Sequence, residues 1–181
     1  MAVNMYHDVP LKITDDFSEI NAVLEIPKGS YVKYEFDYEL GVIKVDRVGK
    51  TPIPYNFNYG DLPQTWNTGD NDPLDVIILC KYPLAVGTVV PCRVVGGLRM
   101  IDSWEYDYKI IAVADDKYYE HVKNINDLGF KEMEDIEYFM LHYKDLHGKK
   151  VEIDGWDPKE KAIEVLKTCH EEYLKTKAPK N

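Results

Sequence analysis

Residues 70–79, DNDPLDVIIL, place an acidic turn directly in front of a short strand, and the rest of the chain is organised around them. Residues 76–79 form a continuous, β-branched apolar run, which is typical of a buried strand. Pro73 fixes its own φ and biases Asp72 towards extended backbone, so the loop before the strand is stiff. The pattern therefore predicts that Asp70, Asp72 and Asp75 are held where this loop enters the core.

Three aspartates so close in sequence raise an electrostatic problem. If their carboxylates converge to about 4 Å, each ionised pair costs about 4 kcal/mol at an effective dielectric of about 20. Three such pairs would cost about 12 kcal/mol, comparable to a domain's stability of about 5–15 kcal/mol. Either the aspartates only cap a turn, or protons or cations neutralise them. Oxygen ligands favour Mg²⁺, Mn²⁺ or Ca²⁺, but an EF-hand loop is a poor fit because Asp75 stands where that loop needs Gly.

The composition is that of one ordinary globular domain. The 181 residues are 45% hydrophobic and 30% charged, so we expect a single domain over residues 1–181 with a core of useful size. Residues 1–20 have no regular pattern, and the polar tail, residues 175–181, is expected to be frayed. The net charge of −10 argues against a protein that binds nucleic acid or membrane surfaces. An anionic substrate would need metal ions and a few placed Lys and Arg side chains to invert the local field.

The cysteines and the N-terminus indicate the compartment. Cys80, Cys92 and Cys169 are scattered and form no C-x-x-C motif, which favours free thiols in a reducing compartment. The N-terminus has neither the basic nor the apolar region of a signal peptide. No run approaches the length of about 18 apolar residues that suggests a membrane span. We therefore expect a cytoplasmic protein.

Short strands fill the first two thirds of the chain, and helices follow. Residues 32–39 alternate between apolar and charged side chains, as in a half-buried strand. After residue 114 the period changes to 3.6, which predicts a helix ending near residue 146 and a second helix after Asp157 and Pro158. This order predicts a mainly β, α+β fold, in which an antiparallel barrel, closed or partly closed, carries two C-terminal helices.

A second acidic loop repeats the construction of the first. Asp102 and Asp107 precede the apolar strand at residues 110–114. In a small barrel two such loops can meet at one rim, where Lys, Arg and Tyr side chains would surround them. An acidic cage ringed by cations suits a polyanion that arrives as a metal complex.

Several short motifs follow one another over roughly residues 20–150. They are E-I-P at 25–27, V-K-Y-E at 32–35, V-D-R at 45–47, N-Y-G at 58–60, D-N-D-P-L-D-V at 70–76, D-x-x-x-x-D-x-K at 102–109 and H-Y-K-D-L at 142–146. In these motifs and in their order the chain resembles the family I soluble inorganic pyrophosphatases of the prokaryotic type.

The resemblance implies a small OB-like barrel and a Mg²⁺-dependent hydrolysis of pyrophosphate to two phosphates. It also implies several Mg²⁺ ions per site, a homo-oligomer with a hexamer favoured, and Asp72 as the general base that activates the water. By resemblance the Mg²⁺ ligands would be Asp70, Asp75, Asp102 and Asp107. The groups that hold phosphate would be Lys33, Arg47, Tyr59, Tyr143 and Lys144. Supporting positions would be taken by Glu25, Glu35, Tyr55 and Lys109.

Two residues depart from the family pattern, and two other functions stay open. Trp104 stands where the family usually has Gly, which puts the conformation of the second acidic loop in doubt, and Asn56 stands where we expect Pro. A different metal-dependent phosphohydrolase would need an apolar pocket for the rest of its substrate. An OB-type oligonucleotide-binding module could use the 14 tyrosines for stacking, although the net charge of −10 opposes it. A purely structural Ca²⁺ site is a weaker third possibility.

Overall fold

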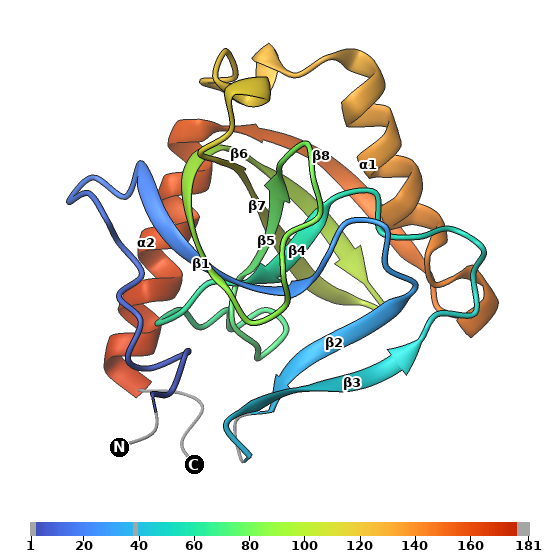
Figure 1. Ribbon diagram of the computed structural model, residues 1–181, viewed down its shortest axis with the longest axis horizontal. Helices are drawn as coiled ribbons and strands as arrows, with labels where there is room; N and C mark the ends of the chain where they lie inside the picture. Colours follow the sequence, from blue (N-terminus) through green and yellow to red (C-terminus); the bar gives the residue numbers. More distant parts are fainter. Residues whose placement is uncertain (1–2, 38–39, 177–181) are drawn as a thin grey trace.

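The computed structural model describes residues 3–37 and 40–176. Five strands form a ring, in the order β1–β4–β5–β7–β6, and the pairing of β1 with β6 closes it (Figure 1). An eighth strand, β8, extends the sheet from β6. The bounds of these strands are β1 Glu19–Ile26, β4 Asn58–Asp61, β5 Asp75–Leu79, β6 Val89–Asp102, β7 Glu105–Ala114 and β8 Val151–Pro158. The predicted OB-like barrel is confirmed.

One pairing in the ring differs from the all-antiparallel barrel that we expected. Strands β5 and β7 are parallel, with Asp75 beside Lys109 and Leu79 beside Val113. The chain reverses direction between β5 and β6 and again between β6 and β7, so β5 and β7 run the same way. Because β7 lies between β5 and β6 in space, it pairs antiparallel with β6 and parallel with β5.

A separate two-stranded sheet stands below the ring in Figure 1 and consists of β2 (Val32–Asp37) and β3 (Val42–Val48). Lys33 pairs with Arg47 in this hairpin, so the two cations share one face of it. Part of the predicted alternating strand, at residues 38–39, lies outside the described residues.

Two long helices follow the strands, as predicted. The first, α1 (Phe130–His142), ends earlier than expected, and a 3₁₀ turn, η3 (Asp145–His147), replaces its last turn. Gly148 ends that turn with φ of 67°, a left-handed conformation that Gly adopts without steric cost. The second helix, α2, spans Lys159–Thr176; two further 3₁₀ turns are η1 (Lys117–Tyr119) and η2 (Ile125–Asp127). The rest of the predicted tail, residues 177–181, lies outside the described part of the chain.

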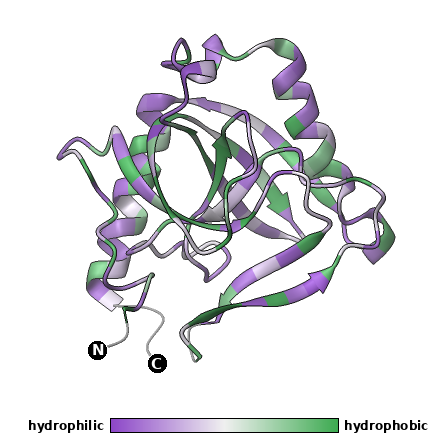
Figure 2. Ribbon diagram, in the orientation of Figure 1, coloured by the Kyte–Doolittle hydropathy of each residue, from purple (hydrophilic) through white to green (hydrophobic). Residues whose placement is uncertain are grey.

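The apolar run at residues 76–79 is continuous because both faces of β5 are buried. Val76 and Ile78 belong to one apolar cluster together with Leu166 of α2. Ile77 and Leu79 belong to a second cluster together with Phe139 of α1. Figure 2 accordingly shows apolar residues concentrated on the central strands, whereas the helices alternate between apolar and polar residues. Among the described helices, none is both long and apolar enough to cross a membrane.

Candidate active site

The loop before β5 is held by two backbone hydrogen bonds and by the side chain of Thr65. The amide of Asn67 donates to the carbonyl of Asp72 (2.8 Å), and the amide of Asn71 donates back to the carbonyl of Asn67 (2.9 Å). The hydroxyl of Thr65 accepts a bond from the amide of Leu74 (2.9 Å), which joins the two ends of the loop. These contacts fix the positions of the aspartates between them.

The structure brings carboxylates from both acidic loops together. One oxygen each of Asp70, Asp75 and Asp107 lie within 4.8 Å of one another. The ammonium of Lys109, which is only 3% exposed, donates to both Asp75 and Asp107. The parallel pairing of β5 with β7 accounts for this contact, because it sets Lys109 directly beside Asp75.

The pKa values of this cluster record its excess of negative charge. Burial, Asp107 and Asp75 raise the pKa of Asp70 to about 7. Burial and Asp75 raise the pKa of Asp72 to about 7 as well. The pKa of Asp107 is also raised, chiefly by burial, although Lys109 opposes the shift. One ammonium thus leaves the cluster short of positive charge.

This donor set fits a hard divalent cation. Its ligand atoms are carboxylate oxygens, which Mg²⁺, Mn²⁺ and Ca²⁺ prefer. Within the described residues Asp70 forms no ion pair. The charge of Lys109 lowers its pKa by less than burial and the neighbouring aspartates raise it, so a metal ion would supply the missing compensation. Asp102 lies outside this cluster and instead contacts Lys144, Ser103 (2.9 Å) and Tyr143 (3.4 Å).

The cluster opens into a pocket of about 190 Å³ between β2, the β6–β7 hairpin and the C-terminal end of α1. The predicted site residues that line it are Lys33, Tyr55, Tyr59, Asp70, Asp72, Asp75, Asp102, Asp107, Lys109, Tyr143 and Lys144. They come from five separate regions of the sequence, and the fold collects them at one rim.

Lysine and tyrosine side chains line the same pocket as the carboxylates. Lys33 forms an ion pair with Glu35, and Lys144 forms one with Asp102. Burial raises the pKa of Tyr59 and of Tyr143 well above the ordinary value, and nearby carboxylates add to the shift. Both hydroxyl groups therefore keep their protons and can donate hydrogen bonds to an anion.

Three predicted residues lie around the pocket and do not line it. Arg47 lines a smaller adjoining pocket together with Lys33, Tyr143 and Lys144, and its guanidinium pairs with Asp46 at 2.8 Å. Glu25 is buried behind the site, where it accepts a bond from the amide of Phe36 (2.7 Å). Glu35 forms an ion pair with Lys33, which lines the pocket.

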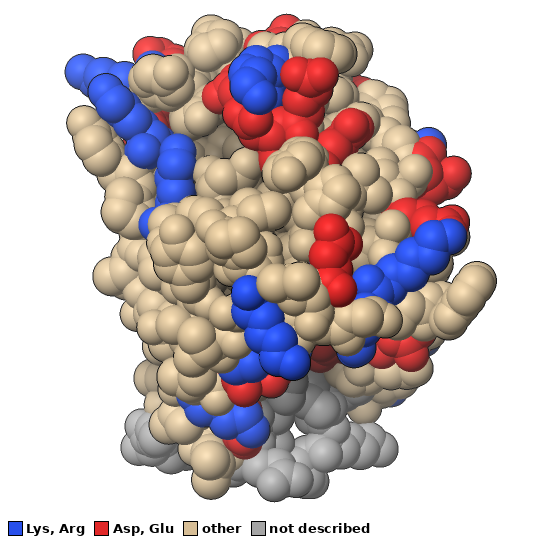
Figure 3. Space-filling model, turned by 90° about the vertical axis from the view of Figure 1, so that its right-hand side faces the viewer, with Lys and Arg blue, Asp and Glu red and all other residues tan. Residues whose placement is uncertain are grey.

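Sequence reasoning missed four polar residues of this region. Ser103, Glu105 and Lys149 also line the pocket. Asp61 lies behind it in the register position opposite Val23, and burial together with Glu25 raises its pKa well above the ordinary value. The sequence did contain one indication that Asp61 lies near the site, because Asp61 directly follows the N-Y-G motif. Charges of both signs are also interspersed on the outer face nearest α1 (Figure 3).

The two departures from the family pattern now have structural accounts. Ser103 and Trp104 have φ of 53° and 77°, so they form the left-handed central pair of a tight hairpin between β6 and β7. Trp104 thus adopts the conformation that Gly would favour, and Asp102 and Glu105 still pair across the turn. The side-chain nitrogen of Asn56 donates to the carbonyl of Asp135 at 2.8 Å, which ties the loop before β4 to α1.

The sequence is similar to a family model and to curated proteins that share one description, inorganic pyrophosphatase. The family model described as inorganic pyrophosphatase matches residues 22–174. The inorganic pyrophosphatase of Xanthomonas axonopodis pv. citri is 47% identical over 160 residues, which cover 86% of this chain and 89% of the relative. That of Geobacillus stearothermophilus is 40% identical over 159 residues, covering 87% and 96%.

The solved structures that resemble this fold include inorganic pyrophosphatases as well. The crystal structure of inorganic pyrophosphatase from Thermus thermophilus superimposes with a TM-score of 0.90 at 36% identity and covers 95% of this chain and 99% of its own. The inorganic pyrophosphatase from Helicobacter pylori gives a TM-score of 0.85 at 38% identity, with coverage of 91% and 98%. Both similarities extend over nearly the whole length of each chain.

Proposed function

This chain belongs to the inorganic pyrophosphatase family, and from that premise we propose that it hydrolyses pyrophosphate to two phosphates with Mg²⁺ as cofactor and Asp72 as general base. The observation that carries the proposal is the cluster of Asp70, Asp75 and Asp107. Among the described residues only one ammonium, that of Lys109, forms ion pairs with these three carboxylates, so negative charge is in excess. Lysine and tyrosine side chains line the same pocket as this cluster.

Asp70, Asp75 and Asp107 would hold the first metal ions, and Asp102 would join them once Lys144 turns towards phosphate. Bound Mg²⁺ would withdraw charge from phosphate oxygens and lower the pKa of a coordinated water. We propose several ions per site, because six carboxylates line the pocket: Asp70, Asp72, Asp75, Asp102, Glu105 and Asp107.

Asp72 is the carboxylate best suited to accept a proton. It lies outside the three-carboxylate cluster. Among the described residues, no hydrogen bond or ion pair engages its side-chain oxygens, so they remain available to a water molecule. A raised pKa near 7 also matches the strength that a general base needs at neutral pH.

The remaining polar groups would bind the phosphates. Lys33 and Lys144 now pair with carboxylates, and a phosphate oxygen would compete for each ammonium. Arg47 would contact the far phosphate from the adjoining pocket, where its fork suits two oxygens at once. Tyr59 and Tyr143 would donate hydrogen bonds without changing the charge balance.

The test is phosphate release from pyrophosphate, measured with Mg²⁺ and with excess chelator, beside adenosine triphosphate and a phosphate monoester as competing substrates. We expect fast release only from pyrophosphate with Mg²⁺. Fast hydrolysis of the other substrates would favour a broader phosphohydrolase, and release that persists in chelator would contradict the metal requirement.

Two substitutions test the roles within the site. We expect Asp72→Asn to lose about 10²–10⁴-fold in turnover, the usual range for a general base, while Mg²⁺ binding measured by calorimetry is kept. Asp75→Asn should weaken both. The exposed Glu134→Gln on α1 serves as the control. Equal Mg²⁺ affinity in Asp75→Asn and the unmodified protein would contradict the assignment of Asp75 as a ligand.

We also propose a homo-oligomer, with a hexamer favoured, acting in the cytoplasm. Exposed valines on β3, at positions 42, 45 and 48, offer apolar surface for a second copy. Cys80, Cys92 and Cys169 are free thiols, which fits a reducing compartment. Light scattering coupled to size-exclusion chromatography tests the assembly, and a monomeric mass at micromolar concentration would refute it.

A further inference from the structure

Residues 4–8 form a compact turn that precedes the region matched by the family model. The side chain of Asn4 accepts bonds from the amides of Tyr6 and His7 (both 3.0 Å). The carboxylate of Asp8 accepts a bond from the amide of Asn4 (2.8 Å). These local bonds give the segment a defined shape that presents the Tyr6 ring inwards, where it is only 3% exposed.

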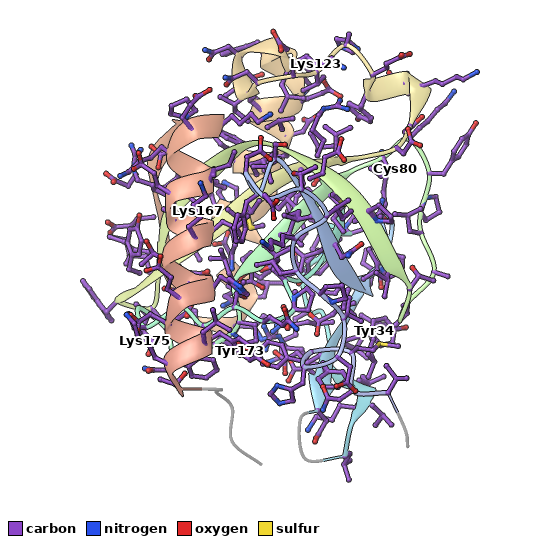
Figure 4. All side chains as sticks on the ribbon, turned by 90° about the vertical axis from the view of Figure 1, so that its left-hand side faces the viewer. Tyr34, Cys80, Lys123, Lys167, Tyr173 and Lys175 are labelled. Atoms are coloured by element: carbon purple, nitrogen blue, oxygen red, sulfur yellow. The ribbon has the colours of Figure 1, made fainter. Side chains whose placement is uncertain are left out.

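The turn sits beside the C-terminal end of α2, near Tyr173 (Figures 1 and 4). The rings of Tyr6 and Tyr173 meet edge to face with centroids 5.4 Å apart, and both belong to one apolar cluster with Phe36 of β2. The hydroxyl of Tyr173 lies 2.8 Å from Nδ1 of His7. Residues 4–8 are therefore packed between α2 and the β2–β3 hairpin.

The same turn is bonded to the start of the aspartate loop. The hydroxyl of Tyr6 donates to the carbonyl of Thr65. The amide of Gln64 donates to the carbonyl of Tyr6 (3.0 Å), and the side chain of Gln64 donates to the carbonyl of His7 (2.9 Å). Gln64 has φ of 55°, which is unfavourable for a residue with a side chain, so these bonds hold a strained backbone in place.

Thr65 transmits this anchoring to the aspartates. Its hydroxyl accepts the bond from the amide of Leu74, so the residue that receives the Tyr6 bond also joins the two ends of the loop. Asp70 and Asp72 lie between those ends. Burial and the charges of Asp61, Tyr173 and Asp72 raise the pKa of Tyr6, so its hydroxyl stays protonated and remains a donor.

We propose that Tyr6 is a positioning residue, whose hydroxyl fixes Thr65 and thereby the carboxylates of Asp70 and Asp72. This inference rests on the function proposed above for these two residues. Tyr6→Phe keeps the ring but leaves the buried Thr65 carbonyl without this donor, so the loop can move. The phosphate-binding groups come from other elements and stay in place.

The kinetic test is a comparison of Tyr6→Phe with the unmodified protein. We expect kcat to fall about tenfold, a typical effect of one buried hydrogen bond, with KM for pyrophosphate unchanged. A rise in KM with unchanged kcat would overturn the proposal, because it would place the effect at the phosphate-binding groups. Unchanged kcat and KM would overturn it too.

Tyr173→Phe is the matched control. It removes a hydroxyl from the same aromatic cluster, yet within the described residues that hydroxyl bonds to His7 and not to the aspartate loop. We expect its kcat to stay within about twofold. An equal loss of kcat in both variants would attribute the effect to the cluster as a whole and would overturn the role of the Tyr6 hydroxyl.

Hydrogen exchange measured without metal or substrate provides a readout that does not depend on the proposed activity. We expect Tyr6→Phe to speed exchange of the amides of Asn67, Asn71 and Leu74 about tenfold, with the barrel strands unchanged. Faster exchange throughout the barrel would indicate general destabilisation, and no change in the loop would overturn the proposal. If the unmodified protein fails to hydrolyse pyrophosphate, this result still decides the positioning role.

Discussion

Replacing the buried Lys109 by Met removes an ammonium that pairs with both Asp75 and Asp107. Lys109 is 3% exposed, so buried Asp107 and half-buried Asp75 lose a compensating charge that is itself shielded from solvent. Each attraction is worth about 4 kcal/mol at about 4 Å and an effective dielectric of about 20, but desolvation offsets part of it. Breaking a buried ion pair typically costs about 3–5 kcal/mol, and we expect Lys109→Met to lose this much stability when metal is chelated.

Divalent cations should reverse part of this loss. For a chain of this size each kcal/mol moves Tm by about 2–4 °C, so we expect a fall of about 6–20 °C in chelator. Mg²⁺ at about 100 times its Kd adds about 2.7 kcal/mol to the folded state. Because the cation no longer shares the carboxylates with an ammonium, the Mg²⁺-induced rise in Tm should be larger in the variant than in the unmodified protein.

The assay is thermal unfolding of both proteins with chelator and across a series of Mg²⁺ concentrations. Lys131→Met is the control, because Lys131 pairs with Asp135 on the surface and its side chain is 78% exposed, so little or no change is expected. A Mg²⁺-induced rise that is no larger in Lys109→Met would refute the reasoning, as would a variant that keeps its full stability in chelator.

Two further predictions concern residues beside the site. Burial raises the pKa of Glu25 to about 8, so its contribution to stability is full below about pH 4.5 and is lost as pH rises through 8. Glu25→Gln, which cannot ionise, should therefore be more stable than the unmodified chain by about 3 kcal/mol at pH 7 and equally stable near pH 4. Urea unfolding at both pH values, without metal, measures this difference. A gain in stability that does not grow with pH would contradict the prediction. Trp104 is 89% exposed and has φ of 77°, so Trp104→Gly should raise the free energy of unfolding by about 1 kcal/mol with unchanged turnover; a destabilised variant would mean that the indole makes contacts that offset its strained backbone.

The barrel with its two following helices was predictable because its signals are local. Hydrophobic alternation and β-branched runs mark strands, and the change to a 3.6-residue period marks α1 and α2. The parallel pairing of β5 with β7 had no such signal. The parallel pairing arises because β7 lies between β5 and β6, and this strand order depends on the closure of the whole ring.

The membership of the site was predictable to a similar degree. Both acidic loops precede buried strands, so their carboxylates had to lie at the edge of the core. The partners of those carboxylates were not predictable, since Lys109 reaches Asp75 across 34 positions and Lys144 reaches Asp102 across 42. Asp61 follows the N-Y-G motif without belonging to it, and Tyr6 lies in no motif, so both were missed, and their roles arise from what they contact.

By itself, the order of residues determined the kinds of groups present: stiff acidic loops, the strands behind them, and the lysines, arginine and tyrosines that suit a metal–phosphate complex. Only the tertiary structure decided which carboxylates meet, which cation neutralises them and which hydroxyl holds their loop. The physical reason is range. Backbone preferences act over a few neighbouring residues, whereas charge compensation and buried hydrogen bonds depend on distances of a few ångströms that exist only after the ring of strands has closed.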